Sequence, residues 1–301
     1  MIRGLDAATD QFLGDLTEIN RRVDRAERQI SSGRRINNPS DAPDEVAHLL
    51  EVRTDLSAVE QIHSNLGRVR TEVDTAEETL RYAVTALDRV TVLGTQGATD
   101  IITGQGRTVL SGEVEGLLSQ LVSMANTQVE GRYIFSGDTD QTSPYSVDLS
   151  TDDPVSAYGG STSTRLVMHP SGTRFAIART ADGIFDSSNP ADNVFDSVNA
   201  LRVALRDDDV PAVRMALANV RTAAVHLNNQ LAWYGGVQNQ VGEATDFASR
   251  QETRLRTRIS EIQDADITQA ILDLQQGRFV QEAALNAQAR KPRSSLFDYL
   301  G

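Results

Sequence analysis

Long apolar stripes at helical spacing run through this chain of 301 residues. One stripe, from Val213 to Leu255, repeats at steps of four and three residues, with one shorter step at Gly235-Gly236. Steps of four and three place side chains on one face of a helix, and a helix over 43–92 would span on the order of 75 Å. Because that exceeds a compact domain, we predict a mainly α fold, an elongated antiparallel helical rod or bundle. The other stripe lies within the predicted helix over 43–92 and consists of Ile62, Leu66, Val69, Val73, Ala76, Leu80, Ala83, Leu87 and Val90.

The two ends of the chain each predict a further amphipathic helix, over about 5–32 and 267–300. A pair of helices alone buries too little apolar area to offset its ordering entropy. We therefore expect paired terminal coiled-coil helices that complete their folding against neighbouring copies of the chain. The predicted subunit-assembly residues are Leu5, Phe12, Leu16, Ile19, Val23, Ile30, Ile267, Ile271, Leu274, Leu285 and Leu296.

Glutamine and alanine are frequent in the last predicted helix. A neutral polar face is unusual for a protein core, but it suits the lining of a wet passage. The candidate channel-lining residues are Gln269, Gln276, Gln281 and Gln288.

The middle of the chain differs in kind, because 132–190 is rich in Gly, Ser, Thr, Asp and Pro. Two short alternating runs, 164–168 and 173–178, flank a four-residue loop and predict a β-hairpin. We therefore expect a small inserted β-rich module. The predicted division is a terminal coiled-coil assembly domain (1–42 and 265–301), an α-helical rod domain (43–131 and 191–264) and a β-rich surface module (132–190).

Composition argues against several classes of function. The formal net charge of −13 disfavours binding to nucleic acid, and no apolar run approaches the roughly 18 residues of a membrane span. There is no cysteine, and His48, His63, His169 and His226 are scattered without metal-ligand spacing. We expect no catalytic residues, no cofactor, no metal and no membrane insertion, hence no enzyme.

Two long motifs carry a family resemblance. QISSGRRINNPSDAP (29–43) and ADITQAILDLQQGRFVQEAALNAQA (265–289) resemble the N- and C-terminal signatures of the flagellin family. Within it, NTQVEGRYIFSGD (126–138) and SLFDYL (295–300) are most similar to the branch of hook-associated proteins at the hook–filament junction.

The resemblance implies a secreted structural component of the bacterial flagellum, exported unfolded by the type III apparatus. It implies a junction ring that self-assembles and provides the template for flagellin addition. The implied partners are copies of the chain, the other hook-associated junction protein, flagellin, and a cytoplasmic export chaperone that holds the last helix. Two alternatives stay open. One is a filament flagellin, and the more distant one is a cytoplasmic coiled-coil scaffold.

Overall fold

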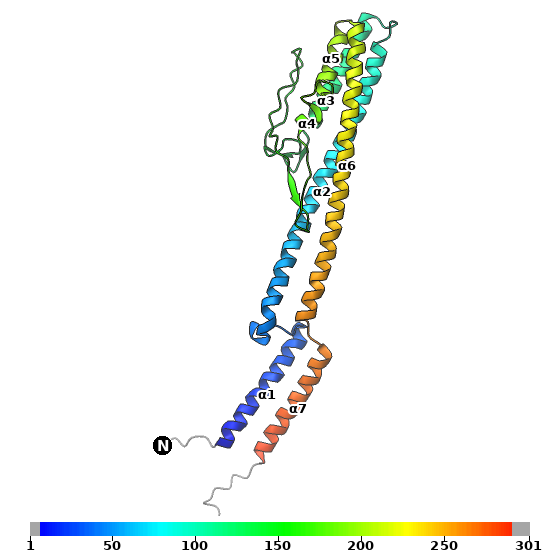
Figure 1. Ribbon diagram of the computed structural model, residues 1–301. Helices are drawn as coiled ribbons and strands as arrows, with labels where there is room; N and C mark the ends of the chain where they lie inside the picture. Colours follow the sequence, from blue (N-terminus) through cyan, green and yellow to red (C-terminus); the bar gives the residue numbers. More distant parts are fainter. Residues whose placement is uncertain (1–6, 291–301) are drawn as a thin grey trace, which may run out of the picture. The chain divides into compact units, whose positions relative to one another are not determined.

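The computed structural model describes residues 7–290 and confirms a mainly α, antiparallel helical fold (Figure 1). All four strands lie between α3 and α4 in the chain, where they form two short hairpins. The helices are α1 (Ala7–Ser32), α2 (Pro43–Gly97), α3 (Gly104–Ala125), α4 (Ala181–Phe185), α5 (Val194–Arg206), α6 (Val210–Gln263) and α7 (Ile267–Ala289), with a 3-10 turn, η1, at Pro39–Asp41. The strands are β1 (Gln128–Val129), β2 (Arg132–Tyr133), β3 (Leu166–Met168) and β4 (Arg174–Ala176).

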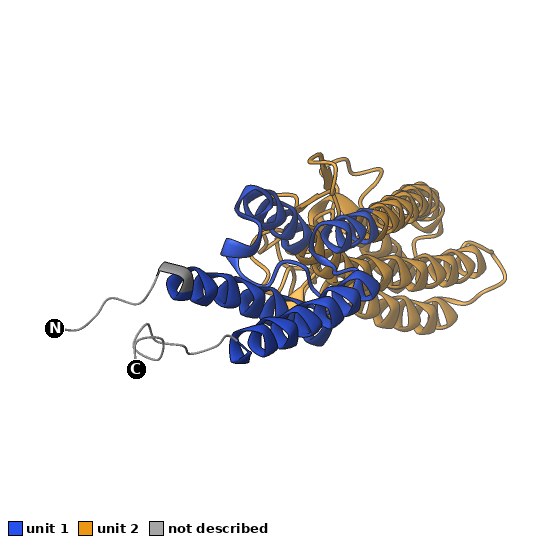
Figure 2. Cartoon of the chain, turned by 90° about the horizontal axis from the view of Figure 1, so that it is seen from below, with its two compact units in different colours: residues 1–58, 251–301 blue, residues 59–250 orange. Residues whose placement is uncertain are grey.

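The chain divides into two compact units (Figure 2). Unit 1 comprises residues 1–58 and 251–301, and unit 2 comprises residues 59–250. The long helices α2 and α6 each contribute to both units. The three-part division predicted from the sequence, with boundaries at 42/43 and 264/265, stays a prediction.

Helix α2 continues to Gly97, five residues beyond the predicted end at Val92. The glycines that suggested a break instead allow close packing on α5. A Cβ at Gly97 would lie 2.3 Å from Leu205 Cδ2, and one at Gly94 would lie 2.9 Å from Leu201 Cδ2. The helix ends only at 98–103, where the buried Arg107 donates to the carbonyls of Gly97 and Thr99 at 2.9 and 3.0 Å.

Helix α6 runs without interruption from Val210 to Gln263, so it passes through Gly235-Gly236 as an ordinary helical segment. A Cβ built on either glycine would meet no heavy atom within 4 Å. The stripe predicted over 62–90 is mostly buried, with Ile62 and Val69 only half-buried.

The core of unit 2 joins α2, α3, α5 and α6 to the segment around the strands. An aromatic cluster shows this joining: Phe135 lies edge-on to Phe185 and to Tyr234, with ring centroids 6.2 and 6.3 Å apart. Phe185 in turn stacks on Phe195 of α5 at 5.6 Å. Residues within the predicted β-rich module are therefore part of the main hydrophobic core.

Both strand pairs are antiparallel hairpins. Strands β1 and β2 are joined through Glu130 and Gly131, which have φ values of 52° and 77°. The predicted hairpin is confirmed as β3 and β4, where Val167 pairs with Phe175 and the His169 N–H donates to Thr173 O at 2.7 Å. Gly172, at φ 92°, closes its loop, a backbone conformation that glycine adopts without strain.

Candidate assembly surface

Helices α1 and α7 lie side by side in unit 1 (Figure 2). The predicted stripe of α1 faces α7: Val23 and Ala26 are buried, while the other four described members are half-buried (Phe12, Leu16, Ile19 and Ile30). On α7 the covered face consists of Ala270, Leu274, Gly277, Gln281, Ala284 and Gln288. Apolar side chains thus meet small or polar ones across this pair.

Gly277 sets how closely the two helices approach. A Cβ at this position would lie 2.8 Å from Val23 Cγ2, well inside an ordinary van der Waals contact. Polar contacts flank this point: Gln281 Nε2 donates to Asn20 Oδ1 at 2.8 Å, and Arg278 Nη2 donates to Glu27 Oε1 at 2.8 Å. Exposed pairs of this kind add little stability. The terminal pair therefore depends mainly on a narrow apolar seam.

Much of α7 remains uncovered in the single chain. The predicted assembly residues Ile267, Ile271 and Leu285 are exposed, in contrast to the half-buried Leu274. Their role in assembly stays a prediction. Leu5 and Leu296 lie outside the described residues.

The sequence interpretation missed three further apolar side chains on α7. Phe279 is 73% exposed, and Leu272 and Val280 are 46% and 47% exposed. At about 100° per residue, they lie on the flank and back of the helix, away from Gly277. Apolar side chains therefore surround α7, a pattern typical of a helix that is covered on all sides. The spacing of these residues in the sequence already places them on other faces of the helix, but the prediction considered only the residues at steps of four and three.

The four candidate channel-lining glutamines do not share one face. Gln269 and Gln276 are exposed, whereas Gln281 and Gln288 are half-buried on the side of α1. The Oε1 atom of Gln288 is buried without a hydrogen-bond partner. The step of five residues from Gln276 to Gln281 turns the helix by about 140°, which explains the division. A channel-lining role stays a prediction for all four.

The motif at 29–43 builds a joint where α1, α2, α6 and α7 meet. Helix α1 ends at Ser32 and is followed by Gly33, whose φ of 70° is the left-handed conformation typical of a glycine after a helix C-terminus. Gly33 O accepts from the Ala265 N–H at 2.9 Å, and the Arg35 N–H donates to Gln263 O at 2.6 Å. These backbone bonds tie the N-terminal turn directly to the turn before α7.

Two arginine side chains complete the joint. Arg35 makes a bidentate ion pair with Glu45 at the start of α2, and its Nη2 also donates to Ile262 O at 2.7 Å. Arg53 Nη2 donates to Oε1 of the buried Gln263 at 2.8 Å. The hydrogen bond from Arg35 lowers the pKa of the Glu45 carboxyl below its usual range. The joint is therefore strongest when Glu45 is ionised.

Two aspartates accept backbone hydrogen bonds at the joint. Asp266 caps α7 by accepting from the Gln269 N–H at 3.0 Å. Asp41, just before α2, accepts from the backbone N–H groups of Asn37 and Asn38, at 3.0 and 2.7 Å. Asp41 therefore folds the preceding turn rather than capping α2.

Over residues 7–290 there is no cluster of three or more His, Cys, Asp or Glu side chains that could hold a metal ion. In the same part of the chain, no helix has the length and apolar character needed to cross a bilayer.

Comparison with known proteins gives consistent matches. Residues 7–140 match the bacterial flagellin N-terminal helical region, and residues 217–300 match the bacterial flagellin C-terminal helical region. Flagellar hook-associated protein 3 of Escherichia coli is 29% identical over 164 residues, which cover 53% of this chain and only 49% of that protein. The protein of the same name from Salmonella typhimurium is 24% identical over 285 residues, 86% of each chain.

The fold is also similar to solved structures. A putative flagellar hook-associated protein from Vibrio parahaemolyticus superposes with a TM-score of 0.66 at 20% identity, over 74% of this chain and 100% of that one. At this level of identity the likeness concerns the fold alone.

Proposed function

Because the chain belongs to the flagellin family, we propose that it is a structural protein of the bacterial flagellum that acts at the junction of hook and filament. The hook-associated names of its relatives support this placement, as do the motifs at 126–138 and 295–300. Under this proposal the chain is secreted by the flagellar export apparatus and performs no catalysis.

The terminal helices carry self-assembly in this proposal. The observation that carries it is the set of uncovered apolar side chains on the faces of α7 that α1 does not cover, with Phe279 the most exposed of its large apolar side chains. Fully burying one such side chain contributes about 1.5–3 kcal/mol, so several together favour association between copies. Helix α1 has a mostly charged outer face, with Arg21, Asp24 and Arg28 exposed, which suits the outside of a ring.

The remaining parts of the proposal follow from this arrangement. Copies would form a ring or tube through the terminal assembly domain (1–42 and 265–301). Gln269 and Gln276 are exposed and neutral, so they can line a wet passage. The ring would contact the other hook-associated junction protein on one side and offer flagellin a template on the other. An export chaperone would cover α7 before secretion.

Immunogold labelling of intact cells tests the placement, with an antibody against residues 139–190. We expect gold at a single position where the hook meets the filament. Gold along the whole filament would make the chain a filament flagellin instead. Label confined to the cytoplasm would refute the flagellar role and favour a coiled-coil scaffold. Cells that lack the gene serve as the control for antibody specificity.

A further inference from the structure

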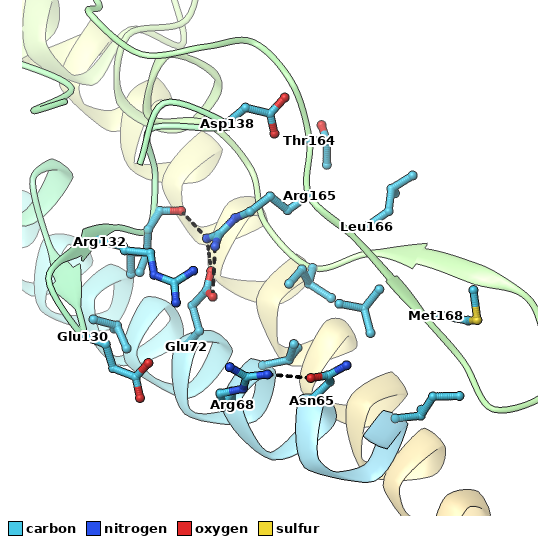
Figure 3. A pocket seen from close by; sticks show the side chains of 16 residues that line it. Asn65, Arg68, Glu72, Glu130, Arg132, Asp138, Thr164, Arg165, Leu166 and Met168 are labelled. Carbon is cyan, nitrogen blue, oxygen red and sulfur yellow. Dashed lines mark hydrogen bonds and ion pairs between the residues drawn. The ribbon is translucent and has the colours of Figure 1, made fainter. Parts of the chain in front are cut away.

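The β3–β4 hairpin lies across an open groove in unit 2 (Figure 3). The groove has a volume of about 640 Å³ and is lined by residues of α2, of β1–β2 and of the hairpin. Over this groove Leu166 and Met168 of β3 remain 59% and 45% exposed. Between them, Val167 pairs with Phe175, and both side chains are half-buried against the core of unit 2. The hairpin is also held by contacts on either side of this pair.

The first leg of the hairpin is anchored on α2. Figure 3 shows the Arg165 guanidinium reaching from the hairpin to Glu72, with which it forms a bidentate ion pair. Arg165 Nη2 also donates to Ile134 O at 3.2 Å. Both members of the ion pair are mostly buried, so the loss of either would leave an uncompensated charge inside the protein.

The second leg is anchored on α6. Just after β4, the Arg179 guanidinium lies 4.5 Å above the Trp233 ring and donates to Gln230 Oε1. The backbone N–H of Arg179 donates to the Tyr234 hydroxyl at 3.0 Å, and Tyr234 is only 1% exposed.

The tip of the hairpin also reaches α6. The His169 ring lies against Phe247, with centroids 5.3 Å apart. The hairpin segment thus contacts α2 at Glu72 and α6 at two positions, Trp233 and Phe247, while the strand β3 between these contacts lines the groove.

Within unit 2, the apolar seams of α2 and α6 do not by themselves define the axial register of the two helices. Both seams repeat at steps of four and three, so a slide that moves one repeat onto the next would place apolar side chains opposite apolar side chains again. C-terminal to Val241, the buried apolar side chains of α6 are only those of Ala244 and Ala248. The polar contacts between the two helices themselves include Gln238 Nε2 to Asp74 Oδ1 at 2.9 Å, which is exposed and weak.

We propose that the β3–β4 hairpin is a cross-brace that ties α2 to α6 and fixes the axial register of one helix on the other. Arg165 is the positioning residue on α2 and Arg179 on α6. The brace acts in the isolated chain, whether or not the chain assembles at the hook–filament junction.

Spin labels on the two helices test the brace directly. The chain has no cysteine, so Ser64→Cys and Glu243→Cys, at exposed positions of α2 and α6, label only those sites in the full-length chain. Double electron–electron resonance then measures the distance between the labels. We expect one narrow distance with Arg165 present. In Arg165→Met we expect a broadened distribution or a second population, since a slide by one seven-residue repeat moves a helix by about 10.5 Å.

Three variants serve as controls. Arg174→Met removes an exposed arginine from the same hairpin and should leave the distance unchanged. The exchange Arg165→Glu with Glu72→Arg should restore the narrow distance. Should Arg165→Met fail to fold, Glu72→Gln weakens the same anchor while keeping a hydrogen-bond acceptor.

An unchanged distribution in Arg165→Met overturns the brace, even if hydrogen exchange shows that the hairpin has been released. So does an equal broadening in Arg174→Met, or an exchange variant that fails to recover the narrow distance.

Discussion

Gly277 is the position where a single added methyl group should separate the terminal helices. In Gly277→Ala the new Cβ would lie 2.8 Å from Val23 Cγ2, and the β-branched Val23 side chain has little rotamer freedom to move aside. Overpacking of this kind costs about 1–3 kcal/mol, whereas alanine in place of glycine gains about 1 kcal/mol of helix propensity. We expect a net loss of about 0–2 kcal/mol in the stability of the α1–α7 pair.

Native-state hydrogen exchange of the full-length monomer measures this change, because it reports the opening of α1 and α7 separately from the rest. A loss of 2 kcal/mol would lower the protection factors of these helices roughly 30-fold, since each 1.4 kcal/mol is tenfold. Gly14→Ala on α1 is the matched control: its Cβ meets nothing within 4 Å, so the same change should raise protection.

The double variant Val23→Ala with Gly277→Ala completes the test. Removing the Val23 methyl groups relieves the overlap, so the second substitution should cost less in this background than alone. If Gly277→Ala instead raised protection as much as Gly14→Ala, the close approach of α1 and α7 would be refuted.

Other substitutions test the surface, the joint and the core. Phe279→Asp should abolish junction assembly and motility in complemented cells, yet leave the monomer's thermal unfolding unchanged because the side chain is exposed; a comparable drop in monomer Tm would contradict this. Arg35 lowers the pKa of Glu45, so the stabilisation is present above the carboxyl's unfolded pKa of about 4.3 and is lost as pH falls through the folded value. Glu45→Gln should therefore weaken the acid-dependent loss of protection in unit 1, and an unaltered pH profile would argue against the joint. Burial raises the pKa of Tyr234 to about 12, so its contribution is complete below its unfolded pKa of about 10 and is lost as pH rises to about 12. In an ultraviolet titration, the wild-type protein and Tyr234→Phe should show the same number of tyrosines that ionise near pH 10, because Tyr234 ionises only at about pH 12. The loss of one such tyrosine in Tyr234→Phe would refute the burial of Tyr234.

The helices could be predicted because their signals are local. The stripe from Ile62 to Val90 and the capping residues Gly33 and Asp266 act within a few residues along the chain, so the printed sequence shows them. The turn of the β3–β4 hairpin is equally local. The end of α2 was predicted five residues too early, because the glycines in its last turns, Gly94 and Gly97, make room for the side chains of Leu201 and Leu205, which are distant in the sequence.

The contacts between residues distant in the sequence could not be predicted. Arg165 and Glu72 are 93 residues apart, and no spacing rule brings them together. In the same way, Gln281 turns toward Asn20 because α1 packs on that side of α7.

Periodicity, turn signals and signature motifs depend on neighbouring residues, so most of the helices, the hairpin and the family could be predicted from the printed residues alone. The close approach of α1 and α7 at Gly277, the exposure of the apolar side chains of α7 and the contacts of one hairpin with both α2 and α6 became known only from the folded chain. These features depend on contacts between segments distant in the chain, where the free energy of packing, rather than local propensity, selects the neighbours.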